Sequence, residues 1–149
     1  MNPIEPSENK IKELISLFDK KKFDQLLKLS NELIDEFPNS ILIQNIQGVV
    51  HTELKNYKLA KNLFIKVVNQ SPNYTDGHYN LANVYNKLDE KEKAIESYNK
   101  VIELDINYFK AHNNLGNIYR KKSLNKRAIE CYLSTLEINS NYKVAYYNL

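Results

Sequence analysis

The segment Lys93-Ala94-Ile95-Glu96-Ser97-Tyr98 returns 34 residues later as Arg127-Ala128-Ile129-Glu130-Cys131-Tyr132. The same spacing relates Asn73-Tyr74, Asn107-Tyr108 and Asn141-Tyr142. A fixed period of this size indicates an array of repeated structural units rather than one globular domain. The period divides the chain into a tail (1–6), four units (7–40, 41–74, 75–108 and 109–142, the first divergent) and a partial unit (143–149).

Each unit contains two stretches in which apolar residues recur at helical spacing. We therefore predict an all-α fold with helices near 8–20, 24–37, 41–54, 57–70, 75–87, 91–104, 109–121, 125–138 and from 143. Small residues recur on the first helix of the units (Gly48, Ala82, Gly116) and on the second (Ala60, Ala94, Ala128). Large aromatic residues (Phe64, Tyr98, Tyr132) follow one turn later. This alternation indicates close packing of paired helices.

The pattern resembles the tetratricopeptide repeat family. The fourth unit matches it with Leu115-Gly116, Tyr119, Ala128 and Tyr132, and the second unit matches with Gly48, Ala60, Phe64 and Pro72. The slot for the family's tryptophan instead holds Gln44, His78, His112 and Tyr146, and the turn glycine is replaced by Lys55, Asp89 and Ser123. The resemblance covers residues 7–149 and implies a right-handed α-α superhelix of helix–turn–helix repeats.

Composition excludes several other classes of protein. Only 3 glycines and 4 prolines are present, too few for a chain of short strands and turns. The net charge of +3 and the lack of a basic stripe argue against nucleic-acid binding. No apolar run approaches 18 residues, so no membrane span is expected. The single cysteine and the absence of a secretory signal at the N-terminus favour a cytoplasmic protein.

No catalytic residue, metal site or cofactor is expected within the chain. His51, His78 and His112 occupy packing slots of the repeat and lack the i, i+4 spacing of two metal ligands on one helix. Cys131 has no histidine within one helical turn that could activate it as a nucleophile. Glycine-rich phosphate loops are also missing.

The resemblance also implies where a partner would bind, because the first helices of successive repeats line a concave groove. The groove changes from apolar, with Ile15 and Phe18, to asparagine-rich and basic. The expected peptide-binding residues are Asn45, Tyr79, Asn80, Asn83, Asn86, Lys87, Lys110, Asn113, Asn114, Asn117, Arg120, Lys121, Tyr147 and Asn148.

Two columns of asparagines, 80/114/148 and 83/117, keep the 34-residue spacing. Amide side chains both donate and accept hydrogen bonds, so such a ladder can hold a peptide backbone. The stretch is similar in this respect to the repeat domain of O-linked GlcNAc transferases. The alternative is family background, since the chain has 21 asparagines and the family often places asparagine in these slots.

Repeats that bind chaperone C-termini hold a carboxylate with three cations and two asparagines. The corresponding slots here are Tyr79, Asn83, Asn114, Val144 and Asn148, without any cation. A carboxylate is held strongly only by charge-assisted partners, so this activity is not expected.

The sequence thus predicts a non-catalytic scaffold or adaptor that binds a protein or peptide ligand. The alternative is the substrate-recruiting N-terminal region of a larger enzyme, such as an O-GlcNAc-type glycosyltransferase or a sulfotransferase. No polar capping helix follows the partial unit, so we expect a piece of a longer protein, or self-association through the uncapped C-terminal end.

Overall fold

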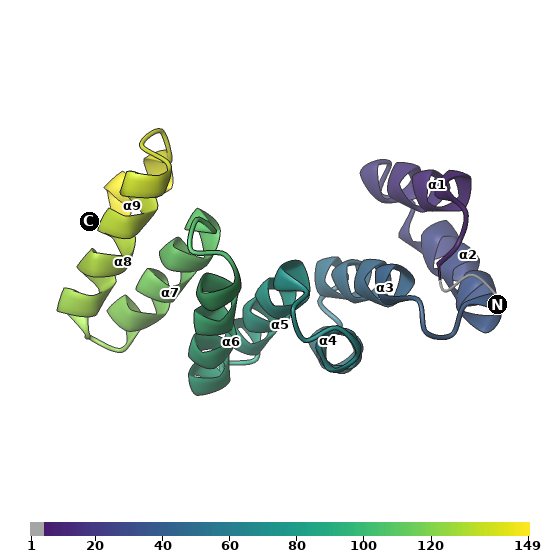
Figure 1. The fold of residues 1–149 in the computed structure, drawn as a ribbon, viewed down its shortest axis with the longest axis horizontal. Helices are drawn as coiled ribbons and strands as arrows, with labels where there is room; N and C mark the ends of the chain where they lie inside the picture. The colour runs from purple at the N-terminus through teal and green to yellow at the C-terminus, as the bar shows by residue number, and fades with distance from the viewer. Residues whose placement is uncertain (1–4) are drawn as a thin grey trace. The chain divides into compact units, whose positions relative to one another are not determined.

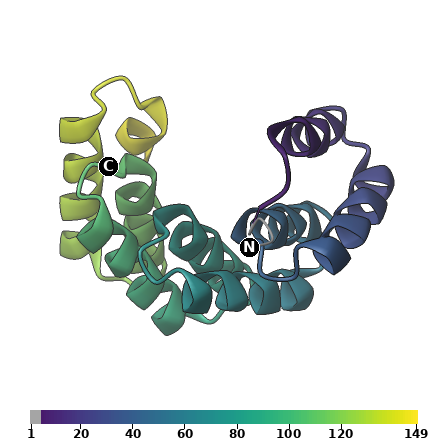
Figure 2. The same ribbon diagram turned by 45° about the vertical axis from the view of Figure 1, so that its right-hand side comes forward.

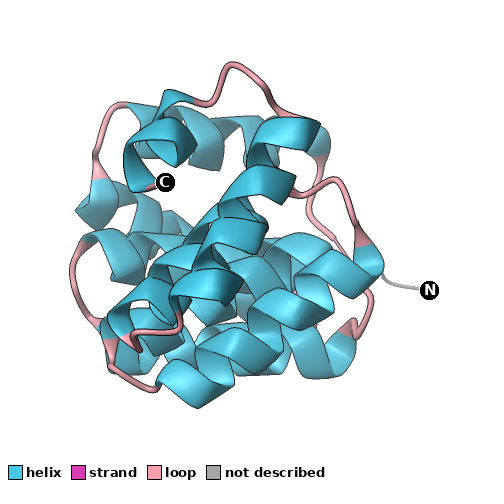
Figure 3. Cartoon of the chain, turned by 90° about the vertical axis from the view of Figure 1, so that its left-hand side faces the viewer, coloured by secondary structure: helices cyan, strands magenta, loops and turns pink. Residues whose placement is uncertain are grey.

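A computed structural model describes residues 5–149; residues 1–4, part of the predicted tail, lie outside the described residues. Those described form helices and connecting loops without strands, which confirms the all-α prediction (Figure 3). The helices are α1 (Glu8–Asp19), α2 (Phe23–Glu36), α3 (Ile41–Glu53), α4 (Tyr57–Gln70), α5 (Thr75–Lys87), α6 (Lys91–Leu104), α7 (Phe109–Lys121), α8 (Asn125–Ile138) and α9 (Lys143–Asn148). Helices α1 to α8 begin and end within one residue of their predicted bounds, and α9 begins at the predicted residue.

The helices form two compact units, Met1–Pro72 with α1 to α4 and Asn73–Leu149 with α5 to α9 (Figure 1). Within each unit every helix packs on the next one in the chain. The helices of each pair run side by side in opposite directions, joined by a short turn (Figure 2). Each unit is therefore built from contacts between neighbours in sequence.

Each unit has its own hydrophobic core. In the first unit the core contains Leu14, Leu26, Leu33, Ile43 and Val50. In the second it contains Ala82, Ala94, Tyr98, Val101, Ala111, Leu115 and Ile118. Burial of one Leu, Ile or Val side chain contributes about 1.5–3 kcal/mol, so these clusters supply the main stabilisation of the helix pairs.

Small residues on the first helix of a pair let an aromatic ring enter the space between the two helices. A Cβ added at Gly48 would lie 2.6 Å from Cε1 of Phe64, and one at Gly116 would lie 2.7 Å from Cε1 of Tyr132. Both distances are shorter than a normal contact, so each glycine makes room for the ring that packs against it.

The turn inside each pair has the same backbone, although no turn contains glycine. Lys21, Lys55, Asp89 and Ser123, spaced 34 residues apart, have φ between 53° and 61°. In the second turn the backbone amide of Lys55 donates a hydrogen bond to the carbonyl oxygen of Thr52 (3.0 Å), and the backbone amide of Asn56 donates one to the carbonyl oxygen of His51 (2.8 Å). This pair of bonds is the Schellman motif, which usually places glycine at the left-handed position.

Glu5, from the predicted tail, binds the N-terminus of α3. Its Oε1 accepts a hydrogen bond from the amide of Ile41 (3.0 Å), and its Oε2 accepts one from the Ser40 hydroxyl. Ser40 Oγ in turn accepts from the amide of Ile43 (3.1 Å). A carboxylate at this position satisfies free amides and interacts favourably with the helix dipole.

We expect Asp89→Gly to stabilise the protein. A residue with a side chain pays about 1–2 kcal/mol to adopt the left-handed conformation, and glycine avoids this cost. Glycine instead loses more backbone entropy on folding, which costs about 0.5–1 kcal/mol. The net gain should be about 0.5–1 kcal/mol, measured as a higher urea midpoint. The matched control Glu96→Gly, at an exposed position inside α6, should lose about 1 kcal/mol. Equal losses in both variants would contradict the prediction.

We expect Glu5→Gln to destabilise the first unit by about 1 kcal/mol, because the amide lacks the charge that interacts with the α3 N-terminus. Glu36→Gln, which removes an exposed carboxylate from the C-terminal end of α2, should cause no loss. Urea unfolding of the two variants checks this, and equal midpoints would show that the Glu5 cap contributes nothing.

Candidate functional site

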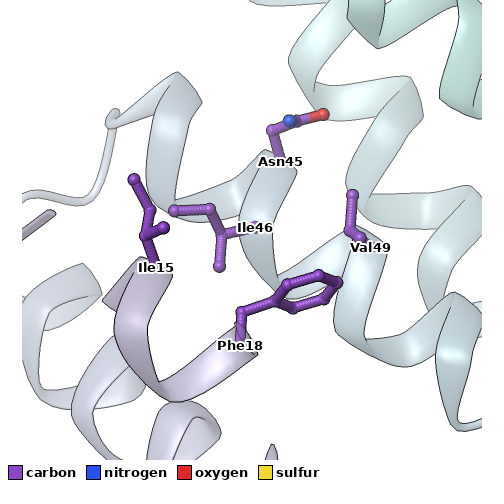
Figure 4. A pocket seen from close by; sticks show the side chains of 5 residues that line it. All are labelled: Ile15, Phe18, Asn45, Ile46 and Val49. Carbon is purple, nitrogen blue, oxygen red and sulfur yellow. The ribbon is translucent and has the colours of Figure 1, made fainter. Parts of the chain in front are cut away.

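An apolar hollow of about 130 Å³ lies between α1 and α3 in the first unit. It is lined by Ile15 and Phe18 of α1 and by Asn45, Ile46 and Val49 of α3 (Figure 4). Ile15, Phe18 and Asn45 belong to the groove that the resemblance implies, and Asn45 is one of the predicted peptide-binding residues. Apolar cavities of comparable size stay dry and take up benzene-sized groups, so the hollow fits one apolar side chain. Ile15 at its edge is 50% exposed and accessible to such a group.

In the second unit the structure brings together three predicted site residues, Tyr79, Asn83 and Asn114. The amide nitrogen of Asn114 lies 3.1 Å from Asn83 Oδ1 and 3.2 Å from the hydroxyl of Tyr79. It also lies 3.3 Å from the hydroxyl of Tyr98, which itself donates to Asn83 Oδ1. These residues come from α5, α6 and α7, so the network joins three helices through side chains.

Burial controls the chemistry of this network. Tyr98 is fully buried, and desolvation raises the pKa of its hydroxyl. Burial also raises the pKa of the Tyr79 hydroxyl. Both groups therefore stay protonated at neutral pH and remain hydrogen-bond donors. Asparagine suits this network because its side-chain amide accepts a hydrogen bond through the oxygen, as in Asn83, and donates one through the nitrogen, as in Asn114.

The next repeat contains a similar arrangement. The hydroxyl of Tyr132 donates to Asn117 Oδ1 at 2.9 Å, as Tyr98 does to Asn83 34 residues earlier. Asn113 is buried, and its Oδ1 accepts from the amide of Asn148 at 3.2 Å. In the equivalent place of the first unit, Phe64 and Val49 replace the tyrosine and the asparagine. The polar pairs of the second unit thus correspond to an apolar pair of which one member, Val49, lines the hollow.

The remaining predicted residues are more accessible. Asn80 and Asn86 are half-buried on α5, and Tyr147 on α9 is exposed. The predicted cations all lie exposed on α5 and α7: Lys87, Lys110, Arg120 and Lys121. Arg120 and Lys121 fall in the last turn of α7, where cations also interact favourably with the helix dipole.

Residues 5–149 include three histidines and one cysteine. They contain no cluster of three His, Cys, Asp or Glu side chains suited to a metal ion. Burial raises the pKa of the Cys131 thiol to about 11, which leaves it protonated and a poor nucleophile at neutral pH. His112 is buried, with Nε2 3.0 Å from the carbonyl oxygen of Ile106. Within this same range no helix is both long and apolar enough to cross a membrane.

Two contributors to these surfaces are absent from the predicted site residues. The repeat pattern predicts only a packing role for Tyr98, although its hydroxyl belongs to the asparagine network. A Tyr–Asn pair 15 residues apart, present twice at the 34-residue period, is the signal that could have revealed this. The 34-residue repeat gives no indication of the role of Glu5, because its contacts with Ser40 and Ile41 have no counterpart at the repeat spacing.

Comparisons with known proteins agree with the repeat assignment. The tetratricopeptide repeat family model matches residues 75–108 and 109–142. Over 71 residues, 48% of the chain, the sequence is 32% identical to the Hsp70-Hsp90 organising protein of Plasmodium falciparum isolate 3D7. That match spans 13% of the relative's length.

Solved structures establish the fold. A crystal structure of MamA aligns with a TM-score of 0.83 at 23% identity, over 89% of this chain and 78% of that one. MamA from residue 41 onward, from Desulfovibrio magneticus RS-1, gives 0.82 at 25% identity, over 95% and 78%. YrrB, described as a TPR protein with an unusual peptide-binding site, gives 0.80 at 20% identity, over 96% and 74%.

These likenesses confirm the predicted fold class, the α-α superhelix. The 34-residue segments 7–40 and 41–74 lie outside the family match, and their assignment as repeats of this family stays a prediction. Residues 75–108 and 109–142 of the chain each match one tetratricopeptide repeat.

Proposed function

We propose that the chain is a non-catalytic scaffold that binds a partner polypeptide through the first helix of each pair: α1, α3, α5 and α7. The observation that carries this proposal is the apolar hollow between α1 and α3, at positions that the repeat pattern assigns to the binding groove. An exposed apolar site of this kind is typical of a surface that takes an apolar anchor residue from a partner.

The comparisons support a binding role in general terms. YrrB is described as having a peptide-binding site, and the Plasmodium relative is named for organising two chaperones. The chaperone partners are not part of our proposal. Three of the slots that would hold a chaperone carboxylate contain Tyr79, Asn83 and Asn114, which bond with one another.

The two units would contribute differently to binding. In the first, the hollow takes an apolar side chain of the partner. In the second, Asn83, Asn114 and Asn117 form hydrogen bonds with the hydroxyls of Tyr98 and Tyr132, so we infer that their main role is to stabilise these buried tyrosines. Contact with the partner then falls to the accessible members of the predicted set, among them Asn80 and the exposed lysines. These cations favour partners with acidic residues.

Ile15→Ser should weaken binding of peptides selected from a displayed random library on the purified chain. Loss of the apolar edge of the hollow should lower affinity at least tenfold, about 1.4 kcal/mol. The control is Ile129→Ser on α8, a similarly exposed isoleucine (44%) that does not line the hollow, and it should leave affinity unchanged. Equal affinities for both variants, or a library that yields no binder, would contradict the proposed function.

Asn114→Ala should destabilise the second unit by about 1–3 kcal/mol, because it removes the hydrogen bonds that Asn114 donates to Asn83, to Tyr79 and to the buried Tyr98. Asn99→Ala, at an exposed position on α6, should change stability by less than about 0.5 kcal/mol. Urea midpoints measure both changes. A fully stable Asn114→Ala variant that loses peptide affinity would instead favour direct peptide contact by Asn114.

A further inference from the structure

A second hollow in the first unit, of about 310 Å³, differs in character from the apolar one. Its walls include Asn31 of α2, Gln47 and His51 of α3, and Leu59, Leu63 and Lys66 of α4. An α-helix turns about 100° per residue, which places Gln47 and His51 on the side of α3 opposite Asn45, Ile46 and Val49. The two hollows therefore lie on opposite faces of one helix.

Hydrogen bonds fix the polar wall of this hollow. Gln47 is 7% exposed, and its amide nitrogen donates to Ser30 Oγ (3.1 Å) and Asn31 Oδ1 (2.9 Å). Ser30 in turn donates to the carbonyl of Leu27 (3.0 Å). Because Asn31 accepts through its oxygen, the group that it can offer to a ligand is its N–H₂ donor.

The ionisable groups that line the hollow are both potential cations. His51 lines the hollow, and its Nδ1 is buried and finds no hydrogen-bond partner among residues 5–149, an arrangement that costs free energy. Lys66 is exposed at the edge and makes no ion pair with any described residue. The hollow has no carboxylate in its lining, so its charge is complementary to an anion.

We propose that this hollow binds the carboxylate side chain of an acidic residue in a partner polypeptide. The carboxylate accepts hydrogen bonds from the Lys66 ammonium, from His51 and from the Asn31 amide. The methylene groups of the ligand lie against Leu59 and Leu63. A carboxylate fits better than a phosphate, since the lining offers one exposed lysine and none of the arginines that hold phosphate with two parallel bonds.

The proposal extends the proposed function to a second face but uses different residues. The probe is therefore N-acetyl-glutamate methylamide rather than a selected peptide, and its neutral control is N-acetyl-glutamine methylamide. The readout is the NMR signal of the His51 ring, with His78 and His112, which do not line the hollow, as internal controls. Failure of the Ile15→Ser experiment would leave this one unaffected.

We expect saturable shifts of the His51 signals with the glutamate probe and at least fivefold weaker binding of the glutamine probe. Burial lowers the pKa of His51 in the free protein, and a bound carboxylate should raise that pKa because it favours the imidazolium form. Lys66→Ala should weaken binding of the glutamate probe at least fivefold. Lys58→Ala, an exposed lysine of α4 outside the hollow, should leave it unchanged.

Three results would overturn the proposal. These are a His51 signal that does not saturate, an equal response to the two probes, and an unchanged affinity of the Lys66→Ala variant. Inorganic phosphate serves as a third probe. If phosphate bound more tightly than the glutamate probe, the hollow would be a phosphate site and the assignment to an acidic side chain would be wrong.

Discussion

The distance between the two helices of a pair is the constraint on which the other features depend. In α3, α5 and α7 the first helix carries a small residue where the second helix inserts a ring, as at Gly48 with Phe64 and Gly116 with Tyr132. The end of such a ring, which comes from the second helix, lies next to a residue on the first helix of the same pair. When the ring is tyrosine, its hydroxyl needs a partner there, and Asn83 and Asn117 supply one.

The same constraint explains why the two units present different surfaces. Phe64 carries no hydroxyl, so the position facing it can be Val49, and the apolar residues Ile46 and Val49 then line a hollow with Phe18. In the second unit the corresponding positions hold asparagines, which bond to tyrosines. Replacement of a phenylalanine by tyrosine, and of a valine and an isoleucine by asparagine, thus distinguishes the polar network from the apolar surface.

The sequence was sufficient to predict the helices, because a 34-residue period combined with apolar spacing locates both ends of each pair. The backbone of the turns was less predictable, since Lys55 and Ser123 stand at the position of the turn glycine without sharing the preference of glycine for a left-handed conformation. The role of the asparagines was only partly predictable. Their positions follow the period, but their engagement with Tyr98 and Tyr132 depends on how deeply those rings are buried. Glu5 and the hollow beside Gln47 occur once in the chain, so repetition offered no clue to either.

The contact of Asn114 with the preceding repeat has a consequence for how such a chain can change in length. Asn114 is the sixth residue of its repeat, and the sixth residue of the repeat before it is Asn80. A tandem copy of residues 75–108 inserted after Tyr108 would present the asparagine of the copy to the original Tyr79, Asn83 and Tyr98. The segment carries both sides of the contact, so a single gene duplication lengthens the array without requiring a new interface to evolve.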